Sequence, residues 1–244
     1  MSDHWDIYFC NIEDKFASIV LDMDVWNEID KSKFSFPKVV RIPIKKPGES
    51  GTPVDDEAEL INELEDVLSQ KIGGLAYNVG RMTINGIREV YYYFSSTYDL
   101  DKLAKEIFNE HNYEVEVFNI DEDNPWEFYF DFLYPDKFQL QHMGNRGVVD
   151  SLSESGDPLG ESRRVDHWLY FNSELDRAGF EGKIITMGFN VELDRTDDSN
   201  EYVSQIYRND YVDLHSINEV TDLLVNVSEE YEGRYDGWET IVLK

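Results

Sequence analysis

The sequence predicts an α+β protein of two domains, each with strands and helices in the order β-α-β-β-α-β. Three observations lead to this prediction. The length of 244 residues suits two domains of ordinary size. Hydrophobic residues make up 41% of the chain and aromatic residues 14%, which is enough to form a core despite the high charge. Segments with strand-like and helix-like spacing of apolar residues alternate along both halves.

The first half begins with a hairpin and continues with one β-α-β-β-α-β series. The hairpin strands are expected at residues 6–12 and 15–22, because apolar residues alternate on both sides of a two-residue turn. The Asn85-Gly86 dipeptide predicts a second tight hairpin. The aromatic segment 126–133 (WEFYFDFL) is expected to extend the sheet as a further strand. The series itself is expected to comprise strand 37–44, helix 55–71, strands 75–84 and 87–95, helix 99–112 and strand 113–120.

A junction is expected at residues 134–137 (YPDK), so the predicted domains cover residues 1–136 and 137–244. Ser173 is expected to cap one helix of the second half, and Ser216 with Glu219 to form a capping box at the start of another. The elements expected after the junction are helix 138–153, strand 165–171, helix 174–187, strands 189–193 and 204–211, a helix from residue 217 and strand 234–243.

The same order of elements in both halves is typical of the ferredoxin-like fold. We therefore predict two ferredoxin-like α/β sandwich domains. The first is extended by extra strands, and the second is preceded by a helix. In the last strand, alternation predicts that Asp236 shares a face with Trp238 if Trp238 points into the core. The apolar residues 241–243 are expected to enter that core.

The charge balance limits the classes of partner. The chain carries 51 acidic and 22 basic residues, a formal net charge of −29. Such a field repels phosphate backbones and anionic membranes, so direct binding of nucleic acid or membrane is not expected. A basic segment of a partner protein would be attracted. The alternative is that the acidity only keeps the protein soluble.

The remaining bulk features predict a cytoplasmic location. The opening residues MSDHWDIYF lack the pattern of a signal peptide, and no apolar run is long enough for a transmembrane helix. The single cysteine, Cys10, excludes an internal disulfide and a cysteine-rich zinc site. It is expected to be a small core residue.

No motif indicates a cofactor. The acidic run 121–123 resembles the start of a calcium loop, but Pro125 interrupts it and no glutamate closes it. Asp194, Asp197 and Asp198 could loosely hold a hard cation, although a solvated loop explains them better. The histidines lack metal-ligand spacing. Asp166 and His167 could suggest a catalytic pair, but neighbouring strand residues point to opposite faces.

Several short segments of the second half occur together in one family. They are SGDP (155–158), VDHWLYF (165–171), MGFNVE (187–192) and YDGWET (235–240). With the helix between the last two, they resemble the bacterial regulators of ribonuclease E activity, type B. This resemblance implies an acidic ferredoxin-like sandwich that binds the ribonuclease and inhibits its RNA processing, without catalytic residues of its own. The first half resembles a domain family of unknown function that is found fused in front of such regulators.

The resemblance supplies the candidate site. The motif positions Asp166, His167, Trp168, Asp236 and Trp238 are candidate binding residues, with either a structural role or a contact role. We therefore predict a non-enzymatic acidic protein that binds and modulates a partner with a basic segment, plausibly a ribonuclease. Two alternatives remain open at this point. One is a divalent-metal-dependent hydrolase that uses clustered carboxylates, and the other is a toxin-neutralising or scaffold protein.

Overall fold

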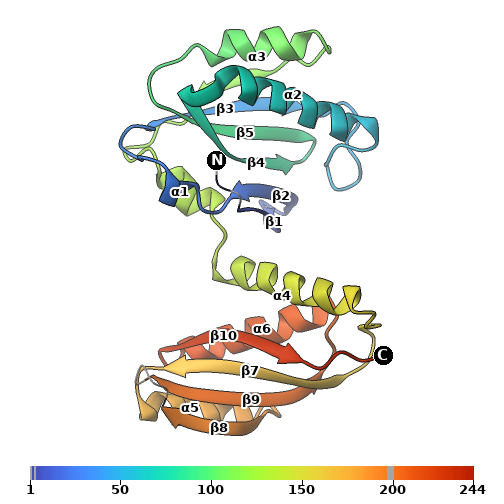
Figure 1. The fold of residues 1–244 in the computed structure, drawn as a ribbon, viewed down its shortest axis with the longest axis vertical. Helices are drawn as coiled ribbons and strands as arrows, with labels where there is room; N and C mark the ends of the chain where they lie inside the picture. Colours follow the sequence, from blue (N-terminus) through green and yellow to red (C-terminus); the bar gives the residue numbers. More distant parts are fainter. Residues whose placement is uncertain (1, 3, 197–200) are drawn as a thin grey trace. The chain divides into compact units, whose positions relative to one another are not determined.

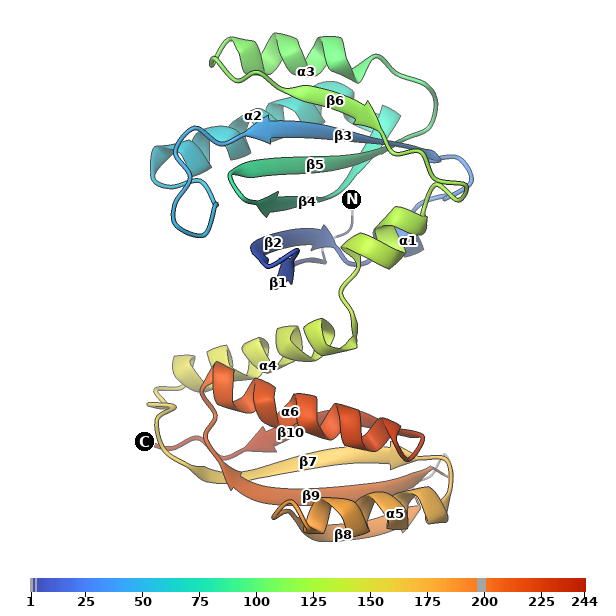
Figure 2. The same cartoon turned by 180° about the vertical axis from the view of Figure 1, so that it is seen from behind.

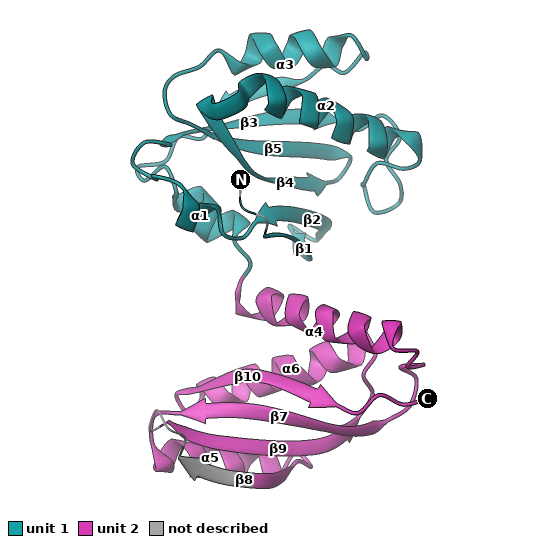
Figure 3. Cartoon of the chain, viewed as in Figure 1, with its two compact units in different colours: residues 1–135 teal, residues 136–244 magenta. Residues whose placement is uncertain are grey.

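The chain forms two compact units, residues 1–135 and 136–244 (Figure 3). The computed structural model describes residues 2, 4–196 and 201–244, and for residues 193–196 it describes the backbone alone. Among the described helices, none combines the length and the apolar character needed to cross a membrane.

Unit 1 contains a six-stranded sheet in the order β1-β2-β4-β5-β3-β6 (Figure 1). All neighbouring strands are antiparallel. The strands are β1 (Trp5–Ile12), β2 (Lys15–Asp22), β3 (Phe36–Pro43), β4 (Ala76–Ile84), β5 (Ile87–Phe94) and β6 (Glu116–Asn119). The helices are α1 (Val25–Glu28), α2 (Asp56–Ile72) and α3 (Leu100–Asn109), with a short 3-10 helix at Gly73–Leu75.

Helices α2 and α3 cover one face of this sheet (Figures 1 and 2). In α2, Ile61, Leu64, Leu68 and Ile72 recur at helical spacing and are all buried. They pack with α3 and with the inward residues of β3 and β5, such as Tyr92. The apolar periodicity that predicted the two helices therefore marks the core of unit 1.

The predicted strand at residues 126–133 is wrong, because this segment is helical and ends in a π-helical turn at Tyr129–Leu133. Trp126 stacks on Tyr93 with 4.1 Å between ring centroids, and its Nε1 donates to the Phe34 carbonyl at 3.0 Å. Trp126, Tyr129 and Leu133 are buried, and their spacing also fits a helix. Tertiary packing thus overrides the β-propensity of the aromatic residues.

Unit 2 contains a four-stranded antiparallel sheet in the order β10-β7-β9-β8. Helices α5 and α6 cover one face of it (Figures 1 and 2). The elements are α4 (Lys137–Glu154), β7 (Arg163–Phe171), α5 (Glu174–Ile185), β8 (Asn190–Thr196), β9 (Tyr202–Asp210), α6 (Leu214–Glu229) and β10 (Gly233–Thr240). Together with unit 1, this confirms the predicted mixed α+β class with antiparallel sheets.

Two predicted element ends of unit 2 are wrong. Helix α6 begins at Leu214 and is capped by Asp213, whose Oδ1 accepts the backbone N–H of Ser216 at 3.1 Å. Ser216 is therefore the third helical residue and not the cap. Strand β10 ends at Thr240, and Ile241 and Val242 are exposed instead of entering the core.

Candidate protein-interaction surface

The side chains of β7 alternate between the two faces of the unit 2 sheet. One set faces the helices and is buried: Arg163, Val165, His167, Leu169 and Phe171. The other set is Arg164, Asp166, Trp168 and Tyr170, of which Trp168 and Tyr170 are partly exposed. No described helix of unit 2 covers this second face (Figure 1). The sheet therefore presents one surface to solvent within its own unit.

We call this surface the open face. Cross-strand pairing adds Gln205 and Tyr207 from β9, which lie opposite Trp168 and Asp166. On the other side of β7, Gly237 lies opposite Trp168 and Glu239 opposite Asp166. The full set is Arg164, Asp166, Trp168, Tyr170, Glu192, Gln205, Tyr207, Arg234, Asp236, Gly237 and Glu239. It contains four carboxylates and two guanidinium groups, so its formal charge is −2.

Arg164 is fixed on the open face by carboxylates and by an aromatic ring. Its Nε and Nη2 donate to the two oxygens of Asp166 at 2.8 and 2.6 Å, and Nη2 also donates to Glu192 at 3.2 Å. Its guanidinium lies over the ring of Tyr207, 3.9 Å from the centroid. The Asp166 carboxylate raises the pKa of Arg164 above its usual range, so Arg164 stays charged.

Arg234 repeats this arrangement on β10. It forms an ion pair with Asp236, two residues further along the strand, and lies 3.9 Å from Glu201. Its guanidinium lies 4.7 Å from the ring centroid of Tyr170. The open face therefore holds two arginines in the same way, each between a carboxylate and a tyrosine ring.

A β-bulge at Asp236 determines which side chains of β10 reach this face. The pairing passes from Tyr235↔Leu169 to Gly237↔Trp168, so one residue of β10 has no partner on β7. Gly237 has a φ of 143°, a conformation that side chains rarely adopt. The expectation that Asp236 shares a face with Trp238 is wrong, because Asp236 is exposed while Trp238 is buried.

The indole of Trp238 is part of a buried polar network. Its Nε1 donates to Oδ1 of Asn145 on α4 at 2.8 Å. Nδ2 of Asn145 donates to Oδ1 of Asn218 and to Oγ1 of Thr221 on α6, both at 2.8 Å. Gln141 also donates to Asn145 at 2.9 Å. Four side chains thus satisfy Asn145, and together they connect α4, α6 and β10.

We predict that Asn145→Ala lowers the free energy of unfolding by roughly 1–3 kcal/mol, because it leaves the buried N–H of Trp238 without an acceptor. The measurement is chemical denaturation of the full chain, followed by tryptophan fluorescence and circular dichroism. Ser151→Ala is the control, because Ser151 is exposed on the same helix. Equal losses in the two variants would contradict the role of Asn145.

His167 lies in the core beneath the open face. Its Nδ1 is 2.9 Å from the hydroxyl oxygen of Tyr235, and its ring contacts Phe189. Among the described residues, none provides a hydrogen-bond partner for the buried Nε2. Burial, with a smaller effect of the Arg208 charge, lowers the pKa of His167 to about 3. The ring is therefore neutral at physiological pH.

This shift predicts a stability loss in acid. The unfolded chain binds a proton at His167 near pH 6.5, whereas the folded chain does so only near pH 3. Between these values the free energy of unfolding falls as pH falls, by up to about 1.4 kcal/mol per pH unit from this group. His167→Gln should show a shallower slope in denaturation curves from pH 7 to 4. His215→Gln is the exposed control and should follow the wild-type slope. Parallel curves for all three proteins would exclude this role of His167.

Asp157 of the SGDP segment also has a structural environment. The buried side chains of Asp157 and Arg163 form an ion pair, and the Asp157 oxygens also accept the backbone N–H of Leu159 and Leu243. Hydrogen bonds from Arg163 hold the pKa of Asp157 well below its usual range. Arg163 also donates to the Ile241 carbonyl at 3.2 Å. These contacts hold residues 241–243 beyond the end of β10, which explains why the strand stops at Thr240.

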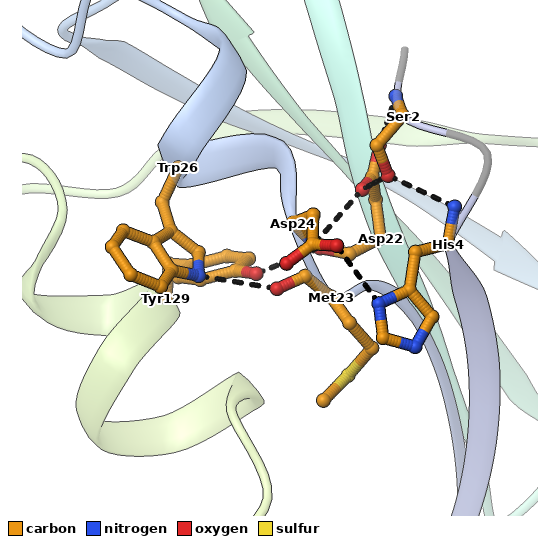
Figure 4. A network of polar contacts seen from close by, with 7 residues as sticks. All are labelled: Ser2, His4, Asp22, Met23, Asp24, Trp26 and Tyr129. Carbon is orange, nitrogen blue, oxygen red and sulfur yellow. Dashed lines mark hydrogen bonds and ion pairs between the residues drawn. The ribbon is translucent and has the colours of Figure 1, made fainter.

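In unit 1, a comparable polar network connects the start of the chain to the end of β2 (Figure 4). Asp22 is buried, and its carboxylate accepts the backbone N–H and the hydroxyl of Ser2. The Tyr129 hydroxyl donates to the Asp22 carbonyl at 2.7 Å, and His4 Nδ1 is 2.9 Å from Asp24 Oδ2. Since these groups satisfy one another, the network stabilises the fold and does not form a site.

The carboxylates considered as metal ligands do not gather in the described structure. Residues 121–123 are exposed, and the side chains of Asp194, Asp197 and Asp198 lie outside the described residues. Within the part of the chain that the structure describes, no group of three or more His, Cys, Asp or Glu side chains is placed to hold a metal ion. Cys10 is a partly buried free thiol in β1.

The structure separates the five candidate residues. Asp166, Trp168 and Asp236 lie together on the open face, while His167 and Trp238 point into the core. Sequence reasoning missed Arg164, Tyr207 and Arg234. The Arg-x-Asp spacing at Arg164 and Arg234 could have indicated them, because residues two apart in a strand share a face.

Fold and site together define a two-unit α+β protein with an exposed aromatic and acidic sheet face. The chain belongs to the Family of unknown function (DUF695), which it matches over residues 3–134, and residues 142–240 match the family Regulator of ribonuclease activity B. Both resemblances seen in the sequence are thereby confirmed. Unit 2 is thus related to regulatory proteins that act on ribonuclease.

Other comparisons add little. No curated protein matches the chain. One similar solved structure is an unknown protein from Galdieria sulphuraria, 11% identical, with a TM-score of 0.24, covering 85% of this chain and 99% of that one. Another is a putative glycine cleavage system transcriptional repressor, 9% identical, with a TM-score of 0.24 and coverage of 84% and 98%. TM-scores this low carry no argument about fold or function.

Proposed function

We propose that this protein is a non-enzymatic cytoplasmic regulator that binds a ribonuclease through unit 2 and inhibits it. The observation that carries the proposal is the match of residues 142–240 to the Regulator of ribonuclease activity B family. The strand order β10-β7-β9-β8, with antiparallel pairing and β-α-β-β-α-β connections, supports a ferredoxin-like fold for this unit. The series from β3 to β6 supports the same fold within unit 1.

The open face is the proposed contact surface. It has a partly exposed tryptophan at its centre and charged side chains around it, as in many protein interfaces. Asp166, Trp168 and Asp236 would contact the partner, while His167 and Trp238 would support the sheet beneath them. The net charge of −29 favours a partner with a basic segment and disfavours direct contact with nucleic acid or an anionic membrane.

Unit 1 is proposed to add a second binding module. The proposed domain boundary between residues 136 and 137 lies one residue from the division of the chain into its two compact units. Two linked modules that bind one partner gain affinity, because binding of the second becomes intramolecular. Unit 1 would then raise the affinity of the regulator or bring a second partner to it.

We predict that the purified chain slows RNA cleavage by a ribonuclease captured from the source organism, and that the affinity falls as salt increases. Trp168→Ala should weaken binding by roughly 30-fold, because a buried interface tryptophan contributes about 2 kcal/mol or more. The measurements are affinity capture at graded salt with mass spectrometry, then titration of cleavage rate with each variant.

The matched control is Leu175→Ala, which removes an 82% exposed apolar side chain from α5 on the other side of the sheet. It should inhibit as the wild type does. Capture of no ribonuclease at low salt would contradict the proposed function. Capture of a basic toxin or of a scaffold component in its place would favour the corresponding alternative.

A further inference from the structure

The centre of the open face has an uncovered aromatic surface next to carboxylates. Trp168 is partly exposed, and Gly237 is its neighbour on β10. A Cβ atom built on Gly237 would meet nothing within 4 Å, so the space beside the indole is unfilled. In the described part of the chain, no aromatic ring or cation is found against the Trp168 ring, unlike Tyr170 and Tyr207.

Two carboxylates flank this space. Asp236 precedes Gly237 and is exposed, and Glu239 follows two residues later on the same face and is also exposed. We call Trp168, Asp236, Gly237 and Glu239 the Trp168 site. Its ring surface would attract a cation electrostatically, and its carboxylates would accept hydrogen bonds from that cation.

We propose that the Trp168 site binds an arginine side chain from a basic segment of a partner protein. The inference rests on the proposed function in one respect, namely that the partner is a protein that binds the open face. The arginine guanidinium would stack on the indole of Trp168 and donate to Asp236 or Glu239. The unfilled space beside Gly237 would admit the arginine side chain.

The open face itself provides the argument for arginine. It already binds two of its own arginines in this manner, Arg164 between Asp166 and Tyr207 and Arg234 between Asp236 and Tyr170. Trp168 is the remaining large ring of the face, and it offers the same combination without its own arginine. A planar guanidinium stacks on rings and pairs with carboxylates, whereas a lysine ammonium is compact and strongly hydrated.

Charge complementarity selects against other occupants. The open face has two more carboxylates than guanidinium groups, so a phosphate backbone would be repelled. A purely apolar side chain would desolvate Asp236 and Glu239 without providing donors for them. A cationic side chain satisfies both the ring and the carboxylates.

The test uses the full chain labelled with ¹⁵N and the indole N–H signals of its five tryptophans. The signal of Trp168 is identified with Trp168→Phe. The probes are a short glycine-serine peptide that carries arginine, the same peptide with lysine or with the uncharged analogue citrulline, and a short single-stranded oligonucleotide. We expect the arginine peptide to shift the Trp168 signal in a salt-dependent way, the lysine peptide to bind more weakly, and the other two probes to cause no shift.

Two charge variants localise the contact. Glu239→Gln should weaken binding of the arginine peptide by roughly two- to fivefold, the range of one exposed ion pair. Glu219→Gln makes the same charge change on α6, away from the open face, and should leave the affinity unchanged. Equal weakening in both variants would mean that only the overall charge attracts the peptide, and this would overturn the inference.

The outcomes also separate this inference from the proposed function. Shifts confined to other tryptophans, or a Trp168 shift with the oligonucleotide and none with the arginine peptide, would overturn the arginine site. If a ribonuclease is inhibited equally by wild type and by Trp168→Ala, the function stands and the site is wrong. If the peptide binds at Trp168 but no ribonuclease is inhibited, the site stands and the function is wrong.

Discussion

The hydrogen bond between Trp238 and Asn145 joins residues 93 positions apart, and the arrangement of unit 2 depends on it. Because Asn145 is fully buried, its donors and acceptors must be satisfied by other side chains, and Trp238, Gln141, Asn218 and Thr221 do this. Trp238 must then face the helices, as does Tyr235, three residues before it. Regular alternation would place these two residues on opposite faces, so β10 needs its one-residue bulge.

The bulge has a consequence on the other face of the sheet. It exposes Asp236 and places Gly237 beside Trp168. One motif, YDGWET, thus supplies both a residue of the buried network and part of the surface that we propose for partner binding. The motif VDHWLYF does the same, with His167 inside and Asp166 and Trp168 outside. Structural and contact roles alternate along each motif because alternate strand residues serve different faces.

The acidity of the protein also divides into two parts. Some carboxylates are buried and bound: Glu57 accepts two backbone N–H groups and the Tyr113 hydroxyl, and Glu65 pairs with Arg81 and Arg88. Asp22 and Asp157 are buried and hydrogen-bonded in the same way. Such acids stabilise the fold and require their local donors. The field available to a partner comes from the exposed acids, which include Asp236 and Glu239 on the open face.

The sequence alone determined the α+β class, the two hairpins and the helices with buried apolar stripes, because these depend on spacing within short segments. Segment 126–133 fits both a strand and a helix by spacing, and only packing against Tyr93 and Phe34 decided it. The bulge at Asp236 and the end of β10 at Thr240 likewise depend on Asn145, Asp157 and Arg163, which lie far away in the sequence. Local periodicity contains no information about such distant partners. Tertiary structure therefore decided which motif residues are buried and which reach the surface.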